Sequence, residues 1–277
     1  MEIFEYVFMR KAFLVGILIA LIIPCIGVTV VLKRISMIGD ALSHTSLAGV
    51  AAGLIFNISP VLGAVIACTG AALSIEAIRK KLPKYSEISI VIIMSLGIGL
   101  AGVLSDYVTT SANFDSFLFG SIIAITDLEV WLVSGLSALV LIAFVIMYRE
   151  LFYIAFDERS ARLSGVKVKT VNFIFTILTA ITVSLASRTV GALIVSSMMV
   201  VPVACSMQIS KNYFKTVIFS VVFALTFTII GLFVSFYQGL KPGSVIVLIG
   251  VACFLIILLI KNILKIFRKT RIKEVQG

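Results

Sequence analysis

The chain has 277 residues, of which 61% are hydrophobic and only 13% are charged, and its formal net charge is +10. An average soluble domain has roughly 25% charged residues, so this composition excludes a soluble globular protein, and its low polarity also excludes a disordered chain. Four cysteines in a chain of this length are too few for a secreted disulfide scaffold. We therefore expect an all-α polytopic membrane protein, built as a single domain over residues 1–277.

Nine apolar runs follow one another along the chain, and a helix needs about 20 residues to cross a bilayer. They lie at 12–32, 35–57, 60–78, 88–105, 128–148, 170–188, 190–209, 214–236 and 244–264. Very short links join the second run to the third and the sixth to the seventh, so we predict about nine transmembrane helices, with a range of eight to ten. Small residues recur at intervals of about four in the second, third and fourth runs, which lets helices pack closely in a compact bundle.

The basic residues predict the orientation of the helices. The tail 261–277 is rich in lysine and arginine, so we place it in the cytoplasm, and nine helices then put the N-terminus outside. Only four of the 23 basic residues then lie outside, namely Arg10, Lys11, Arg188 and Lys241, and 19 lie inside. This bias explains the net charge without a nucleic-acid partner.

The segment 106–127 fits no spanning helix, because its apolar part, 116–126, is too short to cross the bilayer. It could form a re-entrant half-helix or a helix at the outer surface. Asp106 and Asp115 make this region acidic, so it is either an ordinary solvated loop or an outer vestibule that attracts cations.

The segment 149–169 is the longest cytoplasmic link. Its sequence is compatible with a helix through Leu163, and Gly165 stands where a C′ glycine would end that helix. A helix of this size outside the membrane would offer a binding site for a partner protein.

Asp40 and His44 are the two ionisable residues that lie within the apolar runs and away from their ends, and His44 is the only histidine. By contrast, Glu76 lies at a run end, from which its side chain can reach the interface. Residues at i and i+4 share one helix face, and an acid at membrane depth costs at least about 2.5 kcal/mol. A carboxylate with an imidazole could bind a first-row divalent metal, with Ser43 as a further contact. It could also relay protons, or the two side chains could have a purely structural role.

Enzymatic activity is not expected from this sequence. It has no GxxxxGK[ST] motif for binding ATP, and neither HExxH nor GxSxG. Its four cysteines lie singly in different runs, as expected of packing residues. Transport driven by ATP would therefore need a separate ATPase subunit.

The stretch Lys33-Arg34-Ile35-Ser36-Met37-Ile38-Gly39-Asp40-Ala41-Leu42-Ser43-His44-Thr45 resembles the signature of the zinc/manganese/iron-chelate permeases, the membrane subunits of metal-uptake ABC transporters. The zinc-uptake type is the most similar. Asp115 with Leu118-Phe119-Gly120-Ser121, and Val190-Gly191-Ala192-Leu193 followed by Pro202, also resemble this family. The segment from Phe156 to Val166 resembles its cytoplasmic coupling segment, and the resemblance covers nearly the whole chain.

The resemblance implies a permease in a bacterial plasma membrane that imports a divalent metal ion, with Zn²⁺ expected and Mn²⁺ or Fe²⁺ as alternatives. It implies a homodimer with two ATPase subunits and an extracytoplasmic metal-binding protein, and no cofactor. Asp40 and His44 would handle the metal, while Phe156, Asp157, Ala161 and Gly165 would couple the permease to the ATPase. Two alternatives stay open: a proton-coupled transporter using the same pair, and a membrane metalloenzyme, which would need at least three protein ligands.

Overall fold

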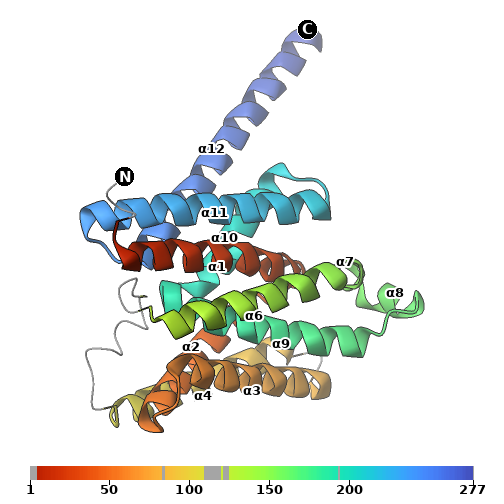
Figure 1. The fold of residues 1–277 in the computed structure, drawn as a ribbon. Coiled ribbons are helices and arrows are strands. Elements are labelled where there is room, and N and C mark those ends of the chain that lie inside the picture. The colour runs from red at the N-terminus through yellow and green to blue at the C-terminus, as the bar shows by residue number, and fades with distance from the viewer. Residues whose placement is uncertain (1–4, 83–84, 109–119, 121–124, 193, 277) are drawn as a thin grey trace.

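The computed structural model of the chain describes residues 5–82, 85–108, 120, 125–192 and 194–276, and all regular elements in these residues are helices (Figure 1). They are α1 (Val7–Leu32), α2 (Ile38–Ile55), α3 (Pro60–Lys81), α4 (Ser86–Ser105), α6 (Asp127–Ile146), α7 (Tyr148–Phe156), α8 (Glu158–Leu163), α9 (Val168–Ala186), η3 (Ser187–Gly191), α10 (Val195–Ile209), α11 (Tyr213–Gln238) and α12 (Pro242–Gln276).

Eight of these helices are long and apolar enough to cross a membrane, and α10 is a shorter apolar helix of 15 residues. The predicted helical membrane bundle and its range of eight to ten spans are confirmed for the described part of the chain. The run predicted at 190–209 is shorter as a helix, because Ser187–Gly191 forms a π-helical turn. Gly191 leaves helical geometry there with a φ of 105°, which glycine adopts readily.

The ends of several helices follow from local sequence. Proline at the first position of α3 needs no hydrogen-bond partner for its nitrogen, and basic residues in the last turn complement the helix dipole. In α6, the Thr126 hydroxyl accepts from the backbone N–H of Glu129, and the Glu129 carboxylate accepts from that of Thr126. This capping box fixes the start of α6.

Helix α2 belongs to a group with α3 and α4 on one side of the bundle (Figure 1). It packs against α3 and α4 on one side and against α9, η3 and α10 on the other, while α1 packs against α6, α9, α10 and α11. A close crossing joins α2 and α3, since a Cβ atom on Gly49 or Gly63 would overlap the other glycine's carbonyl oxygen. A Cβ on Gly97 of α4 would likewise overlap Thr45 of α2. The small residues thus position α2 as predicted, by letting its neighbours approach closely.

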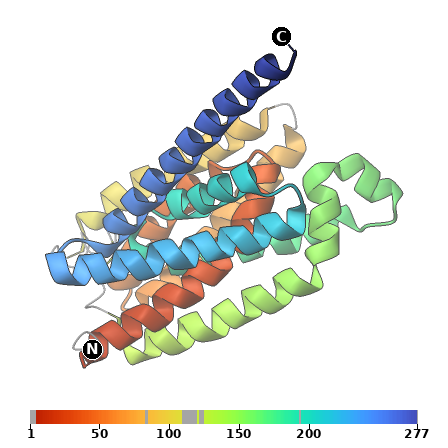
Figure 2. The same cartoon turned by 90° about the horizontal axis from the view of Figure 1, so that it is seen from above.

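Different links and helix ends lie at the two ends of the bundle. The α7–α8 segment, the α1–α2 link and the α10–α11 link lie at one end, and the starts of α1, α6 and α12 lie at the other (Figure 1). Helices α7 and α8 project beside the bundle, and the C-terminal part of α12 extends away from it (Figure 2). The links at the α7–α8 end carry the basic residues that the sequence assigns to the cytoplasm.

Candidate functional site

Asp40 and His44 lie on α2, which packs against α3, α4, α9, η3 and α10. Every other residue of α2 from Ile38 to Ala51 is buried, whereas Asp40 and His44 are partly exposed. The two side chains therefore share the one face of this stretch that is open to its surroundings. At about 1.5 Å per residue, His44 lies roughly 9 Å along a helix about 27 Å long.

Asp40 lies in the first turn of α2, near the positive end of the helix dipole, although the backbone N–H groups of Ile38, Gly39 and Ala41 already donate to backbone carbonyls. Among the described residues, neither Asp40 nor His44 makes a hydrogen bond or an ion pair. No described residue therefore competes with a ligand for either side chain.

Ser43, between them, is buried, and its hydroxyl finds no hydrogen-bond partner in the described part of the protein. Its neighbours differ, since Thr45 donates to the carbonyl of Ala41 at 2.8 Å and Ser46 is hydrogen-bonded to Ser187 of η3. A buried hydroxyl without a partner costs free energy, so it is a candidate for contacting an ion or water.

Helix α10 closes on the start of α2 at Gly39, where a Cβ would overlap the methyl group of Met199 and touch the hydroxyl of Ser196. Sequence reasoning did not identify this contact or the Ser46–Ser187 pair. Gly39 was the only signal available, because a glycine within a helix often marks a close approach of another chain segment.

The described residues hold no cluster of three or more His, Cys, Asp or Glu side chains that could bind a metal. Asp40 and His44 alone leave most positions of a metal's coordination shell open, whereas closed zinc sites use four protein ligands. This arrangement suits an ion that binds briefly and leaves, and it does not suit a structural metal.

Of the two acidic residues assigned to the outer vestibule, only Asp106 is described. It follows α4 directly and is exposed, whereas Asp115 and most of 106–127 lie outside the described residues. Nearby, Asp127 at the start of α6 forms an ion pair of 2.7 Å with Lys11 of α1. The acidic vestibule of Asp106 and Asp115 therefore stays a prediction.

The predicted coupling segment is a helical hairpin, and a break at Asp157 divides it into α7 and α8. Asp157 caps α8 by accepting hydrogen bonds from the Ser160 hydroxyl at 2.5 Å and the backbone N–H of Arg159 at 2.9 Å. These hydrogen bonds lower the pKa of Asp157 below its usual value. Phe156 is 65% exposed and Leu163 is 89% exposed, so the hairpin offers apolar side chains to a partner.

The end of α8 is built around Gly165, which has a φ of 87° at the predicted C′ position. The N–H of Val166 donates to the carbonyl of Ala161, and that of Gly165 to the carbonyl of Arg162. This pair of bonds is a Schellman motif, and it explains the glycine. Ala161 itself is buried and anchors α8.

Aromatic packing connects α7 to the bundle. The ring of Tyr213, at the start of α11, lies 5.3 Å from the ring of Tyr148 and 5.2 Å from that of Phe152. The Tyr213 hydroxyl is hydrogen-bonded at 3.2 Å to Thr29 of α1. A displacement of α7 would therefore be transmitted to α1 and α11 through side chains in direct contact.

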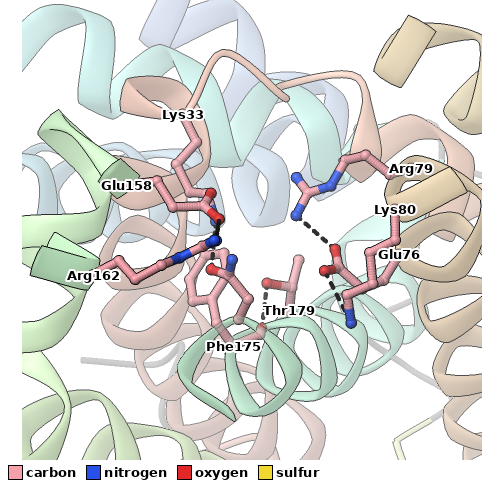
Figure 3. Close-up of polar contacts among 9 residues, drawn as sticks. Lys33, Glu76, Arg79, Lys80, Glu158, Arg162, Phe175 and Thr179 are labelled. Carbon is pink, nitrogen blue, oxygen red and sulfur yellow. Dashed lines mark hydrogen bonds and ion pairs between the residues drawn. The ribbon is translucent and has the colours of Figure 1, made fainter. Parts of the chain in front are cut away.

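A basic cavity, which sequence reasoning missed, lies at the α7–α8 end of the bundle. Its charged groups come from the α1–α2 link, the end of α3, α8 and the start of α9. Figure 3 shows Lys33, Glu158 and Arg162 on one side and Glu76, Arg79 and Lys80 on the other. The expectation that Glu76 reaches the interface is wrong: it is buried, with Arg79 at 2.6 Å and Lys80 at 3.6 Å from its carboxylate. These ion pairs compensate for its burial.

Comparison with known proteins agrees with this architecture. A model of the ABC 3 transport family matches residues 5–261. A "probable metal transport system membrane protein" of Treponema pallidum is 32% identical over 259 residues, which cover 94% of this chain and 97% of that protein. The "manganese import system permease protein ScaB" of Streptococcus parasanguinis is 27% identical, with 91% of this chain and 90% of that protein covered.

Among solved structures, "PsaBC from Streptococcus pneumoniae in complex with Fab" has a similar chain, with a TM-score of 0.83, 26% identity and 92% of each chain covered. A second structure, described as an inward-facing conformation of a putative metal-chelate type ABC transporter, shares the fold with a TM-score of 0.74 at 15% identity, over 90% of this chain and 85% of that one. Family, relatives and fold agree over nearly the full length, and the chain belongs to the ABC 3 transport family as a multi-pass membrane permease.

Proposed function

We propose that this chain is the permease subunit of an ABC importer for a first-row divalent metal ion, and that Asp40 and His44 bind the ion as it crosses the membrane. The observation that carries the proposal is the exposure pattern of α2. Between Ile38 and Ala51, only the carboxylate and the imidazole are partly exposed, and both lack partners among the described residues. A carboxylate and an imidazole suit the first-row divalent metals.

Asp40 and His44 would bind the ion only transiently during transport. Bound metal requires a neutral His44 and an ionised Asp40, because only deprotonated groups bind a metal ion. Water, the Ser43 hydroxyl or a second copy of the permease would complete the coordination shell. Because the protein supplies few ligands, the ion is held weakly enough to move on.

Zn²⁺ and Mn²⁺ are the first two candidates for the transported ion. The resemblance of the α2 signature favours zinc, whereas several relatives carry names that specify manganese. Both ions accept carboxylate and imidazole ligands. Fe²⁺ belongs to the same chemical class and is the third candidate.

The permease acts with partners. A homodimer of permeases would associate with two ATPase subunits, and an extracytoplasmic metal-binding protein would deliver the ion. The exposed apolar side chains of Phe156 and Leu163 on the α7–α8 hairpin support docking of an ATPase at that end. The hairpin's contact with Tyr213 supports transmission of movement into the bundle.

Metal uptake into proteoliposomes that contain the permease, its ATPase and its binding protein tests the proposal. We expect Asp40→Ala, Asp40→Asn and His44→Ala each to reduce ATP-driven uptake of radiolabelled metal at least tenfold, because each removes one of two ligands. Co-purification of the ATPase should be unchanged. Glu87→Gln, which removes an exposed acid at the start of α4, is the matched control and should transport normally.

Uptake of zinc and of manganese, each measured with the other as competitor, identifies the ion. Uptake that stops when a proton ionophore is added, while ATP is still present, would instead indicate a proton-coupled transporter. Normal uptake by both alanine variants would show that the pair is structural and would remove the metal site from α2.

A further inference from the structure

The basic cavity at the α7–α8 end has a volume of about 530 Å³ and is open to the surroundings. Parts of the chain that are distant in sequence meet around it, so it exists only in the folded protein. Its charged groups are six cations and two carboxylates: Lys33, Arg34, Arg79, Lys80, Arg162 and Lys169 with Glu76 and Glu158. The carboxylates can neutralise only part of this charge.

The existing ion pairs leave half of the cations without a carboxylate partner. Glu76 binds Arg79 and Lys80, and Glu158 lies 3.6 Å from Arg162. In the described residues, the side chains of Arg34 and Lys169 make no hydrogen bond or ion pair. The excess positive charge is therefore concentrated on the α1–α2 link and the start of α9.

Lys33 is a partly buried member of this set. Its ammonium group donates a hydrogen bond of 2.8 Å to the neutral amide of Asn172 and lies 5.6 Å from the centre of the Phe175 ring. Burial and the nearby Arg79 guanidinium lower its pKa to about 8, and Glu158 and Glu76 oppose this effect only in part. The surrounding carboxylates therefore do not fully neutralise the charge of Lys33. Such an incompletely neutralised cation is a feature expected of an anion-binding site.

We propose that this cavity binds a phosphate group that belongs either to an anionic phospholipid headgroup or to a soluble phosphate compound. Guanidinium groups bind phosphate oxygens through paired hydrogen bonds, and lysine adds compact positive charge. The cavity exceeds the volume of inorganic phosphate, so it accommodates a phosphoester. Its apolar wall, with Leu32, Ile35, Ile154 and Phe156, would pack against the carbon atoms of such an ester.

The position of the cavity makes a lipid headgroup a suitable source. It lies where α1 ends at Leu32 and α9 begins at Val168, at the boundary of the apolar bundle. Basic pockets between transmembrane helices on the cytoplasmic side are suited to phospholipid headgroups. A bound phosphate would bridge Arg162 on α8 with Arg34 and Lys169, and so hold the α7–α8 hairpin against the bundle.

Binding to the purified full-length permease tests this proposal with two probes. In one arm, delipidated permease in detergent is titrated with inorganic phosphate and with glycerol 3-phosphate, and binding is measured by calorimetry. In the other, native mass spectrometry compares bound phosphatidylglycerol with zwitterionic phosphatidylcholine. We expect the double variant Arg34→Gln/Lys169→Gln to weaken binding at least tenfold for whichever probe, soluble phosphate or phosphatidylglycerol, binds the original chain.

The double variant Lys211→Gln/Lys215→Gln is the matched control. It removes two exposed charges at the same end of the bundle and outside the cavity, one on the α10–α11 link and one in the first turn of α11, and should bind as the original chain does. The single variant Lys169→Gln changes only one exposed side chain, so it still tests the site if the double variant Arg34→Gln/Lys169→Gln fails to fold.

Binding of the phosphates alone identifies a soluble ligand, and selective retention of phosphatidylglycerol identifies a lipid. No binding of either probe, or equal loss in both double variants, overturns the proposal.

Discussion

Individual side chains on α2 differ in how their polar groups are satisfied. Thr45 and Ser46 have hydrogen-bond partners, whereas the buried hydroxyl of Ser43 has none among the described residues. Asp40 and His44 are partly exposed on either side of it. An unsatisfied polar group beside two potential metal ligands is more easily explained by contact with a passing ion than by packing.

Ser43→Ala separates these two explanations. Because the hydroxyl makes no hydrogen bond in the described structure, its removal should leave the thermal unfolding midpoint unchanged or slightly raised. If the hydroxyl contacts the ion, the metal concentration for half-maximal uptake should rise several-fold. Uptake against metal concentration and the unfolding midpoint measure the two effects. A lower midpoint with unchanged uptake would assign the hydroxyl a structural hydrogen bond instead.

At the scale of helices, two kinds of glycine position do not tolerate a side chain: a close helix crossing and a left-handed helix end. The α2–α3 crossing depends on the absence of a side chain at Gly49 and Gly63, while a Cβ on Gly70 of α3 would have no atom within 4 Å among the described residues. At α8, the restriction lies in the backbone, because Gly165 has a φ of 87° and open space around a potential Cβ.

Gly63→Ala and Gly70→Ala form a matched pair on α3. The Cβ at position 63 must push α2 away, which should lower stability by about 1–3 kcal/mol and reduce the unfolding midpoint. The same change at position 70 should be neutral or stabilising, by up to about 1 kcal/mol, because alanine favours helix. Thermal unfolding in detergent checks both variants. Equal unfolding midpoints for the two variants would mean that α2 and α3 do not cross closely at Gly63.

Gly165→Val should uncouple the permease from its ATPase. The left-handed backbone costs a residue with a side chain roughly 1–2 kcal/mol, and more for a β-branched one, so the end of α8 would rearrange. We expect the variant to insert into the membrane but to lose ATP-driven uptake. Gly165→Asn is the control, since asparagine tolerates this conformation, and it should retain most uptake. Normal uptake by the valine variant would exclude the end of α8 from the coupling mechanism.

At the scale of the whole molecule, the charge distribution and the helix count together predict the orientation. Links at the α7–α8 end carry most of the basic residues, and the two termini point to opposite ends of the bundle (Figure 1). In the described part of the chain, eight membrane-length helices and the shorter α10 make nine, so we predict that the termini lie on opposite sides of the membrane.

Reporter fusions at Glu2 and Gly277 test this orientation. We expect a reporter that is active only in the cytoplasm to work at Gly277 and to fail at Glu2, because the basic links favour the cytoplasmic side. A reporter that is active only outside should give the reverse result. Activity of one reporter at both ends would mean that α10 does not cross the membrane with the other helices.

The sequence alone determined the helical bundle and the candidate metal ligands. A lipid environment requires every backbone group to be paired within its own helix, so each apolar run had to become a helix. Asp40 and His44 were recognisable because ionisable groups at membrane depth are costly and therefore rare. Gly165 was recognisable because its role depends only on its own backbone and its immediate neighbours.

Only the tertiary structure decided which side chains meet. The π-helical turn that precedes α10 contacts α2 through the Ser187–Ser46 hydrogen bond, and the apolar pattern of 190–209 does not reveal this turn. The basic cavity brings Lys33 next to Asn172, 139 residues away, and Arg79 close enough to alter the pKa of Lys33. Hydropathy depends only on the residues within one segment, so it can be read from the sequence. These contacts depend on how several helices pack against one another, and the sequence of one segment does not contain that information.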